Sequence, residues 1–206
     1  DVAVAERGSI PSLRWGIRIG ANGVQDRWGD VPFADDMANA LTELGQEVVI
    51  TRHGSHNQSS AYLDDVTLTI RGAEPAAPQA GRINILWVIS RSERVTVDEV
   101  RGYDAVFAAS PSWAAWMSER SGRPVEVLLQ ATAPERFNPG VVPAAQTEDV
   151  LFVGGPRLLE GGRPIVTAAL QAGARVGLWG GRWEDVAPAD LFRGGFLPFD
   201  EAASHY

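Results

Sequence analysis

The chain of 206 residues contains no cysteine and no lysine, and each absence excludes a class of chemistry. Without cysteine there is no disulfide, no thiolate nucleophile and no zinc site with sulfur ligands. The chain has 18 arginines and no lysine, which excludes a Schiff-base lysine and a lysine-type phosphate-binding loop. Any basic side chain that stabilises negative charge in a site of this protein is therefore an arginine.

Membrane, hydrolase and metal signals are also missing. No run approaches the roughly 18–20 apolar residues of a membrane-spanning helix, and the first residues do not join a basic region to an apolar one. We therefore expect a soluble, cytoplasmic protein. There is no G-x-S-x-G elbow for a hydrolase triad. His53, His56 and His205 do not form a cluster, and the pair His53 and His56 lacks carboxylates at ligand spacing, so we expect no metal site.

The charge is unbalanced toward acid. The 26 acidic residues exceed the 18 arginines and give a net charge of −8. Because a negative field repels a polyanion, we predict that nucleic acid is not a partner.

Strand-like and helix-like patterns alternate along the first 130 residues. Residues 13–20 alternate apolar and polar side chains, whereas residues 31–45 repeat apolar side chains at helical spacing. Thr96 and Glu99 have the spacing of a capping box at the start of another helix, and a further helix is predicted to end at Gly122. Further strands are predicted at residues 47–51, 66–72, 83–90, 103–110 and 124–131. This alternation predicts an open α/β sheet whose ligands bind outside the carboxyl ends of its strands.

A proline-rich segment, residues 134–149, breaks both patterns and predicts a connection between domains. We assign residues 1–140 to a Rossmann-like domain and residues 141–206 to the beginning of a second one. The second carries predicted strands at 150–155, 174–181 and 194–199, and predicted helices at 163–173 and from residue 200. Because two strands and a fragment cannot bury both faces of a parallel sheet, we expect this domain to continue beyond Tyr206.

The turn after residue 153 is a candidate anion site. A predicted strand ends in Gly154 and Gly155, Arg157 follows, and a helix is predicted to begin at Arg163. Glycines let a phosphate approach the backbone, a helix N-terminus offers N–H groups, and arginines add bidentate donors for a diphosphate. The spacing matches neither G-x-G-x-x-G nor a Walker loop, so an ordinary turn with two solvated arginines is the alternative.

Several segments, taken in order, resemble the CgeB-like glycosyltransferases of the spore-maturation-protein type. They are W-G-D-x-x-x-A at residues 28–34, RINILWVIS at 82–90, LLQATAPERFNP at 128–139, VLFVGG at 150–155 and LWGGRW at 178–183. The resemblance covers nearly all of the chain from about Trp15. It implies a GT-B fold of two Rossmann-like domains, with an acceptor on the first and a nucleotide-diphosphate sugar on the second, and no additional cofactor or metal.

The resemblance also implies roles for individual residues. The donor would contact Gly154, Gly155, Arg157, Arg163, Gly180, Arg182 and Trp183. The acceptor side of the cleft would be formed by Trp28, Gly29, Ser90, Arg91 and Gln130. Asp30 is the candidate general base for the acceptor hydroxyl, and the alternative is an N-cap of the helix that begins near Val31. For Trp183 the alternative is a core tryptophan beside a tight turn.

Two positions depart from the family pattern. Arg91 stands in S-R-S where such proteins often have S-H-P, and Ala133 stands where A-T-D-P is common. A guanidinium stays protonated, so Arg91 cannot replace a histidine as a base. The leading hypothesis is a glycosyltransferase that moves a sugar from a nucleotide-diphosphate sugar to a hydroxyl of a glycan or similar acceptor. The alternatives are a non-catalytic nucleotide-sugar-binding protein of the same fold and a GT-B-fold nucleotide-sugar epimerase, which needs no acceptor.

Overall fold

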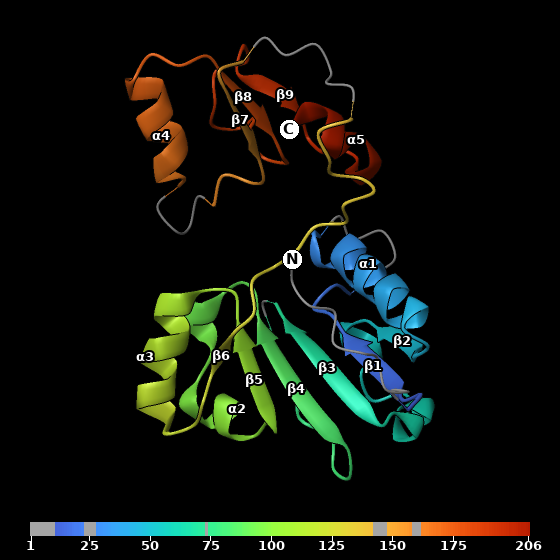
Figure 1. The fold of residues 1–206 in the computed structure, drawn as a ribbon. Helices are drawn as coiled ribbons and strands as arrows, with labels where there is room; N and C mark the ends of the chain where they lie inside the picture. Colours follow the sequence, from blue (N-terminus) through green and yellow to red (C-terminus); the bar gives the residue numbers. More distant parts are fainter. Residues whose placement is uncertain (1–10, 23–27, 73, 142–147, 158–161) are drawn as a thin grey trace. The chain divides into compact units, whose positions relative to one another are not determined.

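The computed structural model describes residues 11–22, 28–72, 74–141, 148–157 and 162–206. The chain divides into two compact units, Asp1–Ala131 and Thr132–Tyr206, and each has a parallel sheet of its own (Figure 1). Among the described residues, no helix has both the length and the apolar character needed to cross a membrane. Each unit is an α/β structure, as the alternating sequence pattern predicts.

The first unit contains six parallel strands in the order β2-β1-β3-β4-β5-β6. Their bounds are β1 (Arg14–Arg18), β2 (Glu47–Thr51), β3 (Val66–Arg71), β4 (Ile83–Val88), β5 (Ala105–Ala108) and β6 (Glu126–Val127). Every strand expected in this region is present, but β6 has only two residues. The strand order reverses between β1 and β3, and in open α/β sheets such a reversal marks a crevice where ligands bind.

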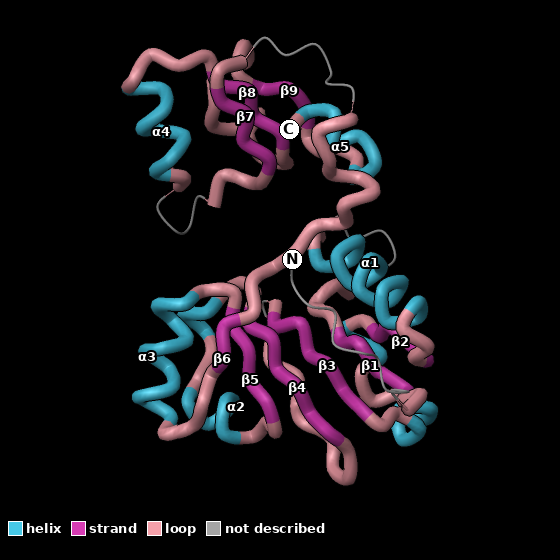
Figure 2. The backbone as a smooth tube through the Cα atoms, in the orientation of Figure 1, coloured by secondary structure: helices cyan, strands magenta, loops and turns pink. Residues whose placement is uncertain are grey.

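Helices cover both faces of this sheet (Figure 2). The helices are α1 (Asp30–Glu43), α2 (Val97–Arg101) and α3 (Pro111–Ser121), with short 3-10 turns η1 (His53–Ser55), η2 (Ser59–Leu63) and η3 (Ser92–Arg94). Ala34 of α1 packs on Ile17 and Ile70 on one face, while Met117 of α3 joins the cluster around Leu86 on the other. The buried core therefore lies on both sides of the central strands, as a parallel sheet requires.

The predicted end of α3 is observed, whereas the capping box predicted for α2 is only half formed. Gly122 ends α3 in a left-handed conformation with φ of +70°, as expected. At α2, the Thr96 hydroxyl accepts from the Glu99 N–H at 3.1 Å, which is half of a capping box. The Glu99 carboxylate does not complete the box. It receives two hydrogen bonds from the buried Arg71 guanidinium at 2.6 and 3.2 Å, because that charge has no water to solvate it.

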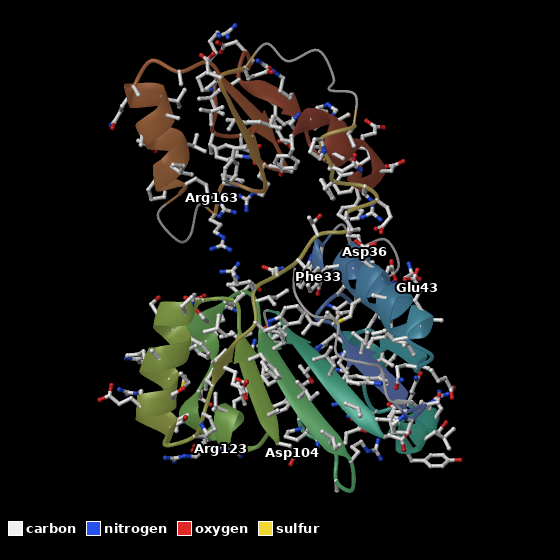
Figure 3. The ribbon with its side chains drawn as sticks, viewed as in Figure 1. Phe33, Asp36, Glu43, Asp104, Arg123 and Arg163 are labelled. Atoms are coloured by element: carbon white, nitrogen blue, oxygen red, sulfur yellow. The ribbon has the colours of Figure 1, made fainter. Side chains whose placement is uncertain are left out.

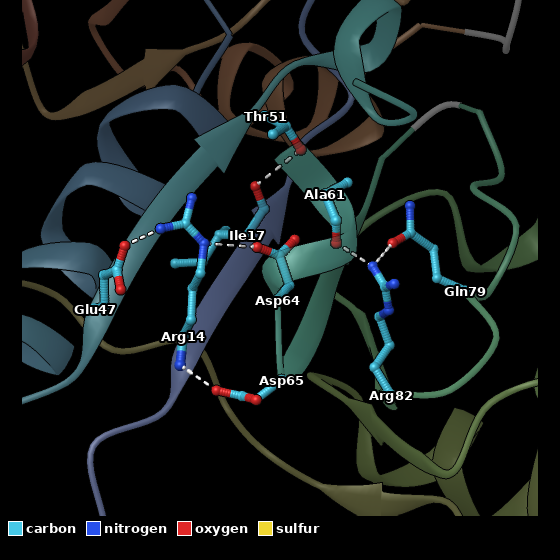
Figure 4. A network of polar contacts seen from close by, with 9 residues as sticks. All are labelled: Arg14, Ile17, Glu47, Thr51, Ala61, Asp64, Asp65, Gln79 and Arg82. Carbon is cyan, nitrogen blue, oxygen red and sulfur yellow. Dashed lines mark hydrogen bonds and ion pairs between the residues drawn. The ribbon is translucent and has the colours of Figure 1, made fainter. Parts of the chain in front are cut away.

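A polar layer joins the loops of the first unit to its sheet (Figure 4). Arg14 of β1 forms ion pairs with Glu47 and Asp64, and its backbone N–H donates to the Asp65 carboxylate at 2.8 Å. Arg82 donates to the Ala61 carbonyl of η2. These bonds hold the segment between β2 and β3, which includes η2, Asp64 and Asp65, against β1 and the start of β4.

The second unit has three parallel strands in the order β7-β8-β9. Its elements are β7 (Val150–Val153), α4 (Pro164–Gln171), β8 (Val176–Trp179), β9 (Phe192–Gly194) and α5 (Phe199–His205). The last strand lies earlier than the predicted 194–199, because it pairs with β8 through residues 192–194. The Trp179 ring covers Gly194 so closely that a Cβ there would lie 2.5 Å from the ring.

Candidate functional site

Each strand of the second unit ends in a pair of glycines at the carboxyl edge of the sheet. These six residues, which we call the glycine floor, are Gly154, Gly155, Gly180, Gly181, Gly194 and Gly195. Backbone hydrogen bonds hold the pairs in register: Gly154 N–H donates to the Trp179 carbonyl at 2.7 Å and Gly180 N–H to the Gly194 carbonyl at 2.8 Å. Since glycine has no side chain, a ligand can approach the backbone of this edge closely.

At two positions of the floor the backbone conformation itself requires glycine. Gly154 and Gly180 have φ values of +145° and +140°, which L side chains rarely adopt. A Cβ on Gly180 would also lie 2.4 Å from the Gly154 carbonyl oxygen and 3.1 Å from the Gly155 nitrogen. The β8 turn is therefore packed directly against the peptide that joins Gly154 to Gly155.

Trp183 lies on the core side of the glycine floor. Its side chain is 6% exposed and packs edge-on against Phe152 with ring centroids 5.9 Å apart. Its indole Nε1–H donates to the Gly154 carbonyl at 2.6 Å. Trp183 is thus a core tryptophan, the alternative that the sequence left open, and it bonds directly to the glycine turn.

Arg163 is the N-cap residue of α4, and its side chain folds back over the turn (Figure 3). Its Nε donates to the Gly155 carbonyl at 2.8 Å, and its guanidinium stacks on the Phe152 ring at 5.0 Å. Pro164 has no N–H, while the N–H groups of Val166 and Thr167 donate to the Arg163 carbonyl. The first turn of α4 therefore offers a ligand fewer donors than the sequence predicts.

Arg157 and Arg182 are exposed residues at the edge of the floor, each just beyond a strand. Both have left-handed backbones, with φ of +50° and +73°, and Arg91 in the first unit has φ of +53°. In the described part of the chain no other residue except glycine has a positive φ. This conformation costs an L residue roughly 1–2 kcal/mol and often marks functional sites. Arg182 also pairs with Asp185 at 3.6 Å.

In the first unit, Trp28, Gly29 and Asp30 follow β1 and enter α1. Gly29, not Asp30, is the N-cap residue, and no side chain caps the helix. Asp30 lies one position later, and its Oδ2 accepts from the Gly20 N–H at 3.1 Å, which ties α1 to the end of β1. Trp28 remains 43% exposed, with its ring 3.5 Å from a Cβ built on Gly20.

The sequence did not single out Gly20 and Gly72, which follow β1 and β3 at the reversal of strand order. A Cβ on either glycine would lie 3.6–3.7 Å from the Cα of the other, and each such Cβ would lie within 4.0 Å of the Asp30 carboxylate. The only sequence signal was a glycine after each strand. The pairing of β1 with β3 is what brings the two together.

The other predicted acceptor residues follow strands farther along the same sheet. Ser90 and Arg91 follow β4, and Gln130 follows β6. With neighbouring strands about 4.8 Å apart, the four steps from β1 to β6 separate those strand ends by about 19 Å. Trp28, Gly29 and Asp30 thus lie together, whereas Gln130 is not beside them.

Buried polar groups support the loops around β1. The Arg18 guanidinium, 3% exposed, donates to the carbonyls of Ala77 and His56 at 2.8 and 3.0 Å, and burial lowers its pKa. Burial also lowers the pKa of His56, which favours a neutral ring whose Nε2 donates to the Ile19 carbonyl at 3.0 Å. Across the described ranges, no three His, Cys, Asp or Glu side chains are grouped so that they could hold a metal ion.

A scan against protein-family models finds no match, and no curated protein matches the chain. The solved structures similar to it include two glucosyltransferase complexes. One is an alpha-glucosyltransferase in complex with UDP and a 13-mer DNA containing a HMU base, at 13% identity and a TM-score of 0.49, over 93% of this chain and 69% of that chain. The other is an alpha-glucosyltransferase in complex with UDP-glucose and DNA containing an abasic site, at 11% identity and a TM-score of 0.46, over 85% of this chain and 64% of that chain.

At these identities the likeness concerns the α/β fold alone. Membership of the CgeB-like family, the GT-B arrangement of two domains and the glycan acceptor are not confirmed. The exclusion of nucleic acid is corrected, because both similar structures contain DNA. That prediction used the net charge of −8, which averages over the whole chain and does not describe the local field at one edge of a sheet.

Proposed function

We propose that the chain belongs to a nucleotide-sugar-dependent glycosyltransferase and that the glycine floor binds the diphosphate of the donor. The observation that carries this proposal is the alignment of three glycine pairs at the carboxyl edge of a parallel sheet, with Arg157, Arg163 and Arg182 around them. A backbone surface without side chains accommodates a bulky anion, and arginines supply bidentate donors for it.

The reaction requires little else from the second unit. The bond between the anomeric carbon and the diphosphate oxygen breaks, and negative charge develops on the leaving nucleoside diphosphate. Positioned N–H groups and guanidinium groups stabilise that charge more strongly in the transition state than in the bound donor. The arginines perform this role without a metal or an additional cofactor.

We assign the acceptor to the first unit, beside Trp28 and Asp30. An acceptor hydroxyl attacks the anomeric carbon and must lose its proton, and Asp30 is the carboxylate that takes it. The Gly20 N–H holds one carboxylate oxygen at 3.1 Å and so orients the group. The exposed part of Trp28 offers an apolar face against which an acceptor ring can stack.

Binding is tested by thermal unfolding with UDP, GDP, TDP, ADP and their sugar conjugates. A ligand at 100 times its dissociation constant adds about 2.7 kcal/mol to the free energy of unfolding, a shift of roughly 5–10 °C for a chain of this size. We expect Arg157→Ala and Arg182→Ala to reduce the shift. Arg175→Ala is the matched control, because Arg175 precedes β8 at the opposite edge of the same sheet and pairs with Asp149 at 2.7 Å. No shift with any nucleotide, or the same loss in the control, contradicts the proposal.

Turnover is tested by release of nucleoside diphosphate in the presence of hydroxyl acceptors, DNA among them. Asp30→Asn keeps an oxygen to accept from the Gly20 N–H but cannot take a proton. We expect unchanged donor binding and a fall in kcat of about 10²–10⁴-fold. Full turnover by this variant would remove Asp30 from the mechanism, and isomerised sugar nucleotide formed without acceptor would indicate an epimerase instead.

A further inference from the structure

In the described part of the chain, three of the five backbone polar groups of the turn from Gly154 to Pro156 are hydrogen-bonded. Gly154 N–H donates to the Trp179 carbonyl, the Gly154 carbonyl accepts from Trp183 Nε1 at 2.6 Å, and the Gly155 carbonyl accepts from Arg163 Nε at 2.8 Å. Pro156 has no N–H. Among the N–H groups of the turn this leaves that of Gly155, which has no acceptor in the part of the chain that the structure describes.

The direction of that N–H is set by the bond to Trp183. No peptide among the described residues is cis, and in a trans peptide the C=O and the following N–H point in opposite directions. Because the Gly154 carbonyl points at the indole of Trp183, which lies in the apolar core of the unit, the Gly155 N–H points away from that core. Gly155 itself is only half-buried, so the N–H is not enclosed by protein.

The same peptide is also prevented from rotating. Gly180 lies against it so closely that a Cβ there would be 2.4 Å from the Gly154 oxygen. Trp183 is held in turn by its edge-on contact with Phe152. The N–H is therefore oriented before any ligand arrives, and a preorganised donor stabilises developing charge without a cost of reorganisation.

We propose that Trp183 is a positioning residue, which fixes the Gly154 carbonyl so that the Gly155 N–H donates to a phosphate oxygen of the donor. The inference rests on the proposed function of the glycine floor. It also changes the role of Trp183, which supports the turn from the core and makes no contact with the nucleotide.

The test uses Trp183→Phe, which keeps an aromatic ring against Phe152 and removes only the indole N–H and part of the ring. Binding of UDP, GDP and ADP is measured by calorimetry beside that of uridine, guanosine and adenosine. We expect the affinity for the nucleoside diphosphate that binds to fall about tenfold, as for one lost charge-assisted hydrogen bond, while the affinity for its nucleoside is unchanged. In the ¹⁵N-labelled protein, the Gly155 amide resonance should move on addition of inorganic diphosphate.

A second variant separates positioning from packing. Val176→Ala opens a cavity in the same core, at the end of β8 opposite the glycine floor, and leaves the indole N–H in place, so it should lower the midpoint of thermal unfolding without changing the ratio of the two affinities. Equal diphosphate binding in wild type and Trp183→Phe overturns this inference alone. Equal loss of diphosphate and nucleoside binding also overturns it, because that is the effect of a disturbed fold. If the wild type binds no nucleoside diphosphate, the proposed function fails first.

Discussion

Gly180→Ala should unfold the second unit at a markedly lower temperature. The backbone of Gly180 has φ of +140°, a region that costs an L residue roughly 1–3 kcal/mol. The added Cβ would lie 2.4 Å from the Gly154 oxygen and 2.6 Å from its carbonyl carbon, and relieving such overpacking typically costs a further 1–3 kcal/mol. At about 4–8 °C per kcal/mol for a unit of this size, a total of about 2–6 kcal/mol lowers the midpoint by about 8 °C or more.

Gly181→Ala is the matched control at the next residue. Its φ is not positive, and the nearest atom to its Cβ would be the Gly195 oxygen at 3.9 Å, an ordinary contact. Differential scanning calorimetry, with near-ultraviolet circular dichroism to follow the tryptophans, should show a large shift for Gly180→Ala and a shift of about 2 °C or less for Gly181→Ala. Equal midpoints for Gly180→Ala and wild type would refute the packing of the β8 turn on the β7 turn.

Three further predictions concern charge and backbone. Because the folded-state pKa of His56 is lowered, the unfolded state binds the proton more readily, and the free energy of unfolding should fall as the pH drops below about 6.5. His56→Gln keeps a donor for the Ile19 carbonyl and should flatten this pH dependence in urea titrations between pH 7 and 5. An unaltered pH dependence in this variant would contradict the prediction. Glu99→Gln leaves the buried charge of Arg71 without a counter-ion and should cost about 3–5 kcal/mol, read as a lower urea midpoint at constant m. Arg182→Gly relieves a left-handed backbone and should be about 1 kcal/mol more stable than Arg182→Ala, although both lose the guanidinium; equal unfolding midpoints would count against strain at this position.

Much of the fold could be predicted because the information is local. The period-two pattern of residues 13–20 became β1, and the helical spacing after residue 31 became α1. Gly122 ends α3 because the left-handed conformation that the turn needs costs glycine little. Two details were predicted wrongly because they depend on partners far away in the sequence. The position of β9 is set by its pairing with β8, and the Glu99 carboxylate accepts from Arg71 on β3 rather than completing the capping box.

Part of the candidate site could likewise be predicted from local sequence, and part of it could not. A strand followed by two glycines and an arginine predicted an anion-binding turn at residues 154–157, and the structure has a glycine turn there. The sequence did not reveal that the three glycine pairs lie in register, since strand order decides that. Nor did it distinguish a side chain that contacts a ligand from one that holds the backbone, as Trp183 does.

The sequence by itself determined the alternation of strands and helices, the turns that require glycine, and the absence of lysine and cysteine chemistry. Each of these depends on a residue type or on neighbours within one or two helical turns. Only the tertiary structure decided the strand order, the meeting of Gly20 with Gly72, and the bond from Trp183 to Gly154, which are 29 residues apart. Those contacts depend on how the apolar faces of separate elements pack together, and the packing involves the whole chain of each unit rather than any one segment of it.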